Sequence, residues 1–92
     1  MPRFLIEVPH GDSQRECLHA IDTFLRTGSH FLRNADWGCK DGEHKAWLTI
    51  DVESKADAKS VVPPDFRANA KVVQLTTYTR EDMEQSARQH GA

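Results

Sequence analysis

Alternating apolar and polar positions predict two strands. In the segment 3–8, Phe4, Ile6 and Val8 occupy every second position and share one face of an extended chain. Residues 45–52 repeat this pattern, with apolar residues on one face: Ala46, Leu48, Ile50 and Val52. The opposite face carries Lys45, Trp47, Thr49 and Asp51. Both segments are therefore predicted as strands that bury one face.

A third strand is predicted over residues 71–78, which are rich in β-branched side chains. Its pattern leaves the phase open. The outward positions are either Val72, Gln74 and Thr76 or Val73, Leu75 and Thr77.

Helices are predicted where a capping box precedes a segment with apolar residues at helical spacing. Ser13 and Glu16 open a helix that ends near Gly28, with an apolar stripe: Cys17, Leu18, Ile21, Phe24 and Leu25. Ser54 and Asp57 open a short helix that Pro63-Pro64 stops. Thr79 and Asp82 open a terminal helix over 79–92, which has few apolar anchors and is expected to fray at its end.

A hairpin is predicted around Asp41-Gly42, because this dipeptide favours a two-residue turn with positive φ at both positions. The resulting register places Cys39 opposite His44 and Trp37 opposite Ala46. It also assigns four residues to the apolar side: Phe31, Arg33, Ala35 and Trp37. Arg33 fits that side poorly, which leaves three alternatives: a bulge, a guanidinium that reaches the edge of the sheet, or a longer turn.

The predicted order is β-α-β-β-α-β followed by the terminal helix. This order indicates an α+β, ferredoxin-like domain, with a four-stranded antiparallel sheet and two helices on one face. Residues 1–92 are predicted to form a single domain, since chains of this length rarely divide.

Composition narrows the possible functions. The net charge is -2, without a basic run, which argues against nucleic-acid binding. An apolar fraction of 38% is low for so short a chain, so a homodimer is expected to complete the burial. No apolar run is long enough to span a membrane, and Glu7 interrupts the short one near the start. With only two cysteines, Cys17 and Cys39, a cytoplasmic protein with free thiols is expected.

The order and length of the elements resemble the dimeric α+β-barrel proteins, which include muconolactone-isomerase-like proteins. The segments that carry the resemblance are 20–25, 45–52 and 70–75. It implies a ferredoxin-like domain whose sheet packs face to face with that of a second copy. It carries over no catalytic residue, so it predicts no chemistry.

The open face of the predicted sheet is the first candidate site, because it mixes aromatic and carboxylate side chains. Glu7, Asp36 and Trp47 lie there and, with Trp37, are the candidates for ligand binding. The candidates for catalysis are Glu7, Asp36 and His30. A small-molecule pocket and a dimer interface with charges at its rim are both consistent with this face. A non-catalytic interaction module anchored by Trp37 and Trp47 is the alternative function, and whether the protein is an enzyme stays open.

A metal or redox site around Cys39 and His44 is a further alternative. His30 and Asp36 have ligand chemistry too, and His10 and His19 are possible additions. A histidinium beside Cys39 would lower the pKa of the thiol. The spacing matches no CxxC or HxxxH motif, so the sequence predicts neither a bound metal nor a cofactor.

Overall fold

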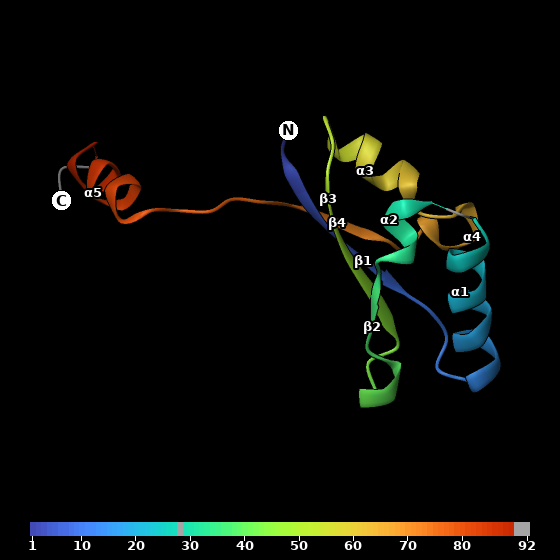
Figure 1. Ribbon diagram of the computed structural model, residues 1–92. Coiled ribbons are helices and arrows are strands. Elements are labelled where there is room, and N and C mark those ends of the chain that lie inside the picture. The colour runs from blue at the N-terminus through green and yellow to red at the C-terminus, as the bar shows by residue number, and fades with distance from the viewer. Residues whose placement is uncertain (28, 90–92) are drawn as a thin grey trace.

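The computed structural model describes residues 1–27 and 29–89 and shows an α+β domain with a four-stranded antiparallel sheet (Figure 1). The strands are β1 (Arg3–Pro9), β2 (Asp36–Trp37), β3 (Lys45–Asp51) and β4 (Lys71–Leu75). Their order in the sheet is β2-β3-β1-β4. Glu7 of β1 lies opposite Trp47 of β3 on one side and Lys71 of β4 on the other, which defines the register.

Helices cover one side of this sheet, and the other side is bare (Figure 1). They are α1 (Gln14–Arg26), α2 (His30–Arg33), α3 (Lys55–Val61) and α4 (Pro64–Arg67), and a 3-10 turn, η1, spans Cys39–Asp41. A fifth helix, α5 (Arg80–Gln89), stands apart at the end of an extended linker on the bare side (Figure 1). No helix in the described ranges is long and apolar enough to cross a membrane.

The core lies between the sheet and the helices, as the alternation predicts. Its strand residues are Phe4, Ile6, Val8, Ala46, Leu48, Ile50 and Val72. Helix and loop residues complete it: Phe24, Leu32, Ala58 and Val62. On α1 the buried side chains are Cys17, Ala20 and Phe24. Leu18 and Leu25, predicted in the apolar stripe, are exposed instead, because they lie at the edge of the face that α1 turns to the sheet.

The three predicted helix starts are confirmed by their caps. The hydroxyl of Ser13 accepts a hydrogen bond from the Glu16 amide at 3.1 Å, and that of Ser54 accepts one from the Asp57 amide at 3.1 Å. At α5 the box is reciprocal, with the Asp82 amide donating to the Thr79 hydroxyl at 3.1 Å and the Thr79 amide to the Asp82 carboxylate at 2.9 Å. The predicted cap at Gly28 lies outside the described residues.

The proline pair has two roles. Val62 is extended, with φ -69° and ψ 132°, so α3 ends before Pro63 as predicted. Pro64 then occupies the start of α4, where its missing amide hydrogen has no helical partner to lose. A second turn of helix, α4, therefore follows the end of α3 directly.

The predicted strand over residues 31–37 is wrong. Residues 30–33 form α2, and only Asp36 and Trp37 pair with β3. Helical geometry turns Leu32 into the core and leaves Phe31 exposed, and the Asn34 side chain donates to the His30 carbonyl at 2.8 Å. In this helix Arg33 no longer has to face the core, which removes the conflict noted in the sequence.

The turn before β3 is longer than the predicted two residues. The Gly38 carbonyl accepts hydrogen bonds from the amides of Asp41 and Glu43, both at 3.0 Å, and closes the 3-10 turn η1. Positive φ occurs at Gly42 alone (83°), whereas the predicted turn requires it at Asp41 as well. The predicted pairing of Trp37 with Ala46 is nevertheless confirmed.

β4 also differs from the prediction in length, since it ends at Leu75 and the linker begins at residue 76. Its phase is now settled. Val72 is buried, while Val73 pairs with Leu5 and Leu75 with Arg3 on the bare side of the sheet.

Candidate metal centre

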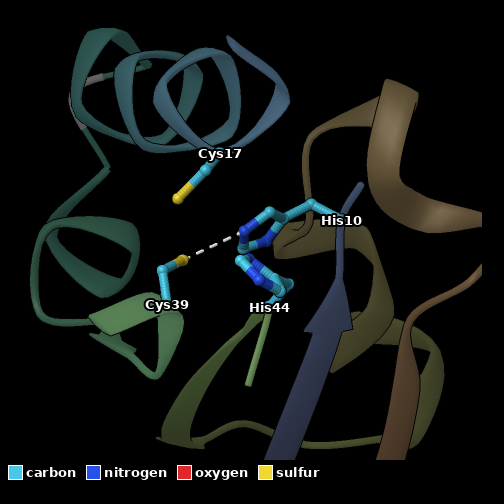
Figure 2. A group of neighbouring side chains, drawn as sticks. All are labelled: His10, Cys17, Cys39 and His44. Atoms are coloured by element: carbon cyan, nitrogen blue, oxygen red, sulfur yellow. Dashed lines mark hydrogen bonds between the residues drawn. The ribbon is translucent and has the colours of Figure 1, made fainter. Parts of the chain in front are cut away.

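Four side chains with metal-ligand chemistry meet at one end of the sheet. They are His10, Cys17, Cys39 and His44, and their donor atoms all lie within 4.8 Å of one another. Figure 2 shows the two thiols pointing toward the two imidazole rings. Among the described residues, this is the group of His, Cys and acidic side chains whose spacing suits a metal ion.

Strand pairing places the two histidines side by side. His10 directly follows β1, and His44 directly precedes β3. These strands are antiparallel with Pro9 opposite Lys45, and the His10 amide continues the ladder by donating to the His44 carbonyl at 3.0 Å. The end of one strand and the start of the other therefore coincide in space.

The cysteines come from two tight local structures. The chain turns after His10, and Cys17 lies in the first turns of α1, where its amide donates to the Ser13 carbonyl at 3.0 Å. Cys39 is the first residue of η1, which Gly38 and Gly42 bracket. Cys17 is buried and Cys39 half-buried, so the cluster lies just beneath the surface.

The spacing suits a tetrahedral site. With Zn–S bonds of about 2.3 Å and Zn–N bonds of about 2.0–2.1 Å, the donors of such a site stand roughly 3.3–3.8 Å apart. His10 Nε2 and Cys39 Sγ already lie 3.1 Å apart and form a hydrogen bond. No pair of donors exceeds 4.8 Å, so all four lie near the spacing that one tetrahedral ion requires.

Burial favours the neutral forms of the ligands. The pKa of His10 is lowered by burial and by the neighbouring His44, while Glu16 opposes this shift. The pKa of Cys39 is raised to about 11 by burial and by the hydrogen bond with the Cys17 thiol. The lowered thiol pKa expected from a nearby histidinium is therefore wrong, and Cys39 is no activated nucleophile on its own. A divalent cation would reverse this by binding the thiolate.

Two ring nitrogens in the cluster lack partners. His10 Nδ1 and His44 Nδ1 are buried without a hydrogen bond from the described part of the chain. A buried polar atom without a partner costs roughly 1–3 kcal/mol, so such atoms are rare. His10 contacts Cys39 through its other ring nitrogen, Nε2. Neutral imidazole with a free nitrogen is also the form that binds metal.

An aromatic shell holds the His10 ring in place. The centroid of this ring lies 5.7 Å from that of Trp37 and 5.8 Å from that of His44. Trp37 packs edge-on against Phe24 in the core, with centroids 4.9 Å apart. Trp37, predicted as a ligand-binding or partner-anchoring residue, thus lies on the helix side of the sheet, next to the His10 ring of the cluster.

A groove of about 280 Å³ opens from this cluster to the surface. Three cluster residues line it, Cys17, Cys39 and His44, together with Asp12, Gln14, Leu18 and Lys40. The cluster is thus reachable by ions and by small polar molecules.

The other predicted site residues gather elsewhere. His30, Asp36 and Trp47 line a separate pocket of about 380 Å³ beside the later part of β3, which β2 does not cover. Glu7 is not among the residues that line it. Its carboxylate accepts a hydrogen bond from Trp47 Nε1 at 3.2 Å and lies 3.8 Å from Lys45 Nζ.

Sequence reasoning paired Cys39 with His44 and named His10 as an addition, but it treated Cys17 as an ordinary apolar residue of α1. His19 lies against Phe66, and neither it nor His30 or Asp36 belongs to the cluster. One signal in the sequence could have identified the cluster, namely the antiparallel pairing of the first and third strands of a ferredoxin-like order. It brings residues 10 and 44 together and puts the start of α1 beside them.

Comparisons with protein-family models, with curated proteins and with solved structures give no match.

Proposed function

We propose that this protein binds one zinc ion through His10, Cys17, Cys39 and His44. The observation that carries the proposal is the convergence of four zinc-type donors, from four separate segments, to within 4.8 Å of one another. Two thiolates and two imidazoles in a tetrahedral arrangement are typical of zinc among the biological divalent metals.

The ligand count favours a structural role for the ion. Catalytic zinc keeps a position for water or substrate, whereas four protein ligands close the coordination sphere. Here the ion would connect the end of β1, the start of α1 and the turn η1. Because the sites of such ions do not persist in the unfolded chain, their binding free energy stabilises the fold.

Metal analysis of the full chain, purified without chelators, tests the proposal. We expect one zinc per chain, and cobalt substitution should give the visible spectrum of a tetrahedral thiolate site. A Cys17→Ser, Cys39→Ser double variant should lose both signals, and the matched control His19→Ala should keep them. Substoichiometric metal in the wild type, or full retention in the double variant, would refute a site at these residues.

We also propose the ferredoxin-like arrangement and a homodimer formed through the bare face of the sheet. The strand order β2-β3-β1-β4, with helices on one side, supports the former. For the latter, Val73 and Leu75 are 39% and 38% exposed on that face, and α5 projects on the same side, where a second copy would meet it (Figure 1).

Sedimentation velocity tests the dimer. The wild type should sediment as a dimer and Val73→Asp as a monomer, because a buried, unpaired carboxylate destabilises an apolar interface. Leu18→Asp, at an exposed apolar position on the helix side, is the matched control and should stay dimeric. A monomeric wild type would end this proposal.

The pocket beside β3 supports a second candidate function, binding of a small molecule. A volume of about 380 Å³ is in the range of ligand sites, and an aromatic ring, an imidazole and a carboxylate meet there as Trp47, His30 and Asp36. Screening a fragment library by NMR should shift the Trp47 indole N–H signal. Fragments that move only signals outside the pocket, or none, would argue against a site there.

A further inference from the structure

We propose that peroxide converts Cys17 and Cys39 into a disulfide and thereby releases the zinc. This inference rests on the proposed zinc site and adds a redox control to it. The chain has two cysteines, and both belong to the same cluster, with sulfur atoms within 4.8 Å of each other.

The sulfurs are close enough to react with each other. A disulfide requires an S–S distance of about 2.05 Å, so the two side chains must approach further by rotation about their Cα–Cβ bonds. Cys17 lies near the start of α1 and Cys39 at the start of a short 3-10 turn, and each is thus held by a different element that faces the other (Figure 2). In the reduced protein, the metal takes the place of this bond.

The groove above the cluster gives an oxidant access to the sulfurs. Its lining includes both cysteines and the side chain of Lys40, and its volume of about 280 Å³ exceeds that of several water molecules. Cys39 is half-buried whereas Cys17 is 9% exposed, so Cys39 is the sulfur that peroxide meets first. Cys17 is then placed to resolve the oxidised intermediate.

The chemistry proceeds in two displacements. Zinc would hold Cys39 as a thiolate, although burial raises the pKa of the free thiol. This sulfur leaves the metal and attacks hydrogen peroxide, the O–O bond breaks, and a sulfenic acid forms while the hydroxide that leaves takes up a proton as water. The Cys17 thiolate then attacks the Cys39 sulfur, forming the S–S bond and expelling the sulfenic oxygen, which takes up a second proton as a second water. Two thiolates lose two electrons in total, and one peroxide gains them.

Metal release follows from the loss of ligands. A disulfide sulfur carries no negative charge and is a poor ligand for zinc, which needs thiolate. His10 and His44 alone remain, and two neutral imidazoles on separate segments hold the ion far more weakly than the complete set. The disulfide meanwhile keeps α1 joined to η1, so the fold persists while the ion departs.

The zinc-loaded full chain treated with hydrogen peroxide tests this directly. Zinc release is followed with a chromogenic chelator, and the thiol state by intact mass and by peptide mapping without reduction. We expect one zinc released for each Cys17–Cys39 disulfide formed, on monomeric chains in a non-reducing gel, and full rebinding after dithiothreitol and added zinc. The variant His19→Ala, which lies outside the cluster, should behave as the wild type does.

The outcomes separate the two proposals. Zinc that stays bound while the Cys17–Cys39 disulfide forms would overturn the release, and it would also remove these two cysteines from the ligand set. Cysteines that go to sulfinic acid without any disulfide would overturn the disulfide switch and leave the zinc site standing. A chain that holds no zinc before oxidation would overturn the zinc site and this inference with it.

Discussion

Replacing Gly38 by alanine should weaken the hairpin that presents Cys39. The backbone of Gly38 has φ -99°, which any residue adopts, so backbone strain is not the issue. The obstacle is space. A Cβ at this position would lie 2.7 Å from the Glu43 carbonyl oxygen and 2.7 Å from Cζ3 of the Trp47 ring.

Gly42 is the matched control, since it lies at the other end of the same 3-10 turn. Its φ of 83° is unfavourable for alanine, but nothing lies within 4 Å of an added Cβ. Strain of this kind costs roughly 1–2 kcal/mol. At Gly38 one of the clashing atoms is backbone and the other belongs to a ring that donates a hydrogen bond to Glu7, so neither gives way easily. Overpacking of this kind costs about 1–3 kcal/mol.

Two measurements on each variant test the reasoning. Urea unfolding of the zinc-loaded protein should show a lower free energy of unfolding for both Gly38→Ala and Gly42→Ala. Zinc affinity, measured by chelator competition, should fall about tenfold for Gly38→Ala. The clash displaces Cys39, and a loss of about 1.4 kcal/mol in binding free energy lowers the affinity by a factor of ten. An unchanged affinity in Gly38→Ala, together with wild-type stability, would show that the Trp47 ring and the turn do not position Cys39.

Further predictions concern the ligands, the core and the terminal helix. Cys17→Ser should lower zinc affinity by at least tenfold in the same competition assay, because even the loss of outer-shell partners costs 10–100-fold at such sites, and an unaltered affinity would remove Cys17 from the ligand set. Phe24→Ala should cost about 3–5 kcal/mol in urea unfolding, since the ring is 1% exposed and packs against Trp37; a loss under about 1 kcal/mol would contradict this packing. The pKa of Asp82 is lowered by its hydrogen bonds with the amide and hydroxyl of Thr79, so its contribution to α5 is complete above the ordinary aspartate pKa and is lost as the pH falls through the lowered value. The Thr79 amide signal in NMR should therefore titrate below the ordinary pKa, and Asp82→Asn should abolish that titration.

Local interactions explain why much of the scaffold could be predicted. Capping needs only residues three apart, so Ser13, Ser54 and Thr79 mark helix starts wherever the chain is placed. Alternation within β1 and β3 similarly assigns a buried face, because a strand turns successive side chains to opposite sides. These features follow from neighbours in sequence.

The predictions for residues 30–43 were wrong because the structure of this segment depends on contacts with distant parts of the chain. Phe31, Arg33 and Ala35 have the period of a strand, yet burial of Leu32 against the core stabilises a turn of helix there. The Asp41-Gly42 pair has the composition of a tight hairpin turn. The Gly38 carbonyl, however, accepts hydrogen bonds from two amides and thereby closes a longer turn. Which of two local structures forms is decided here by what each packs against.

The candidate metal site, too, was predicted in part from the sequence and decided in part by the tertiary structure. From the sequence came the ligand types, the pairing of Cys39 with His44 and the possible addition of His10. Only the tertiary structure added Cys17 and excluded His19, His30 and Asp36. The physical reason is distance along the chain. Residues 10, 17, 39 and 44 approach one another through the pairing of β1 with β3 and the packing of α1 on that sheet, and both depend on contacts between segments far apart in sequence.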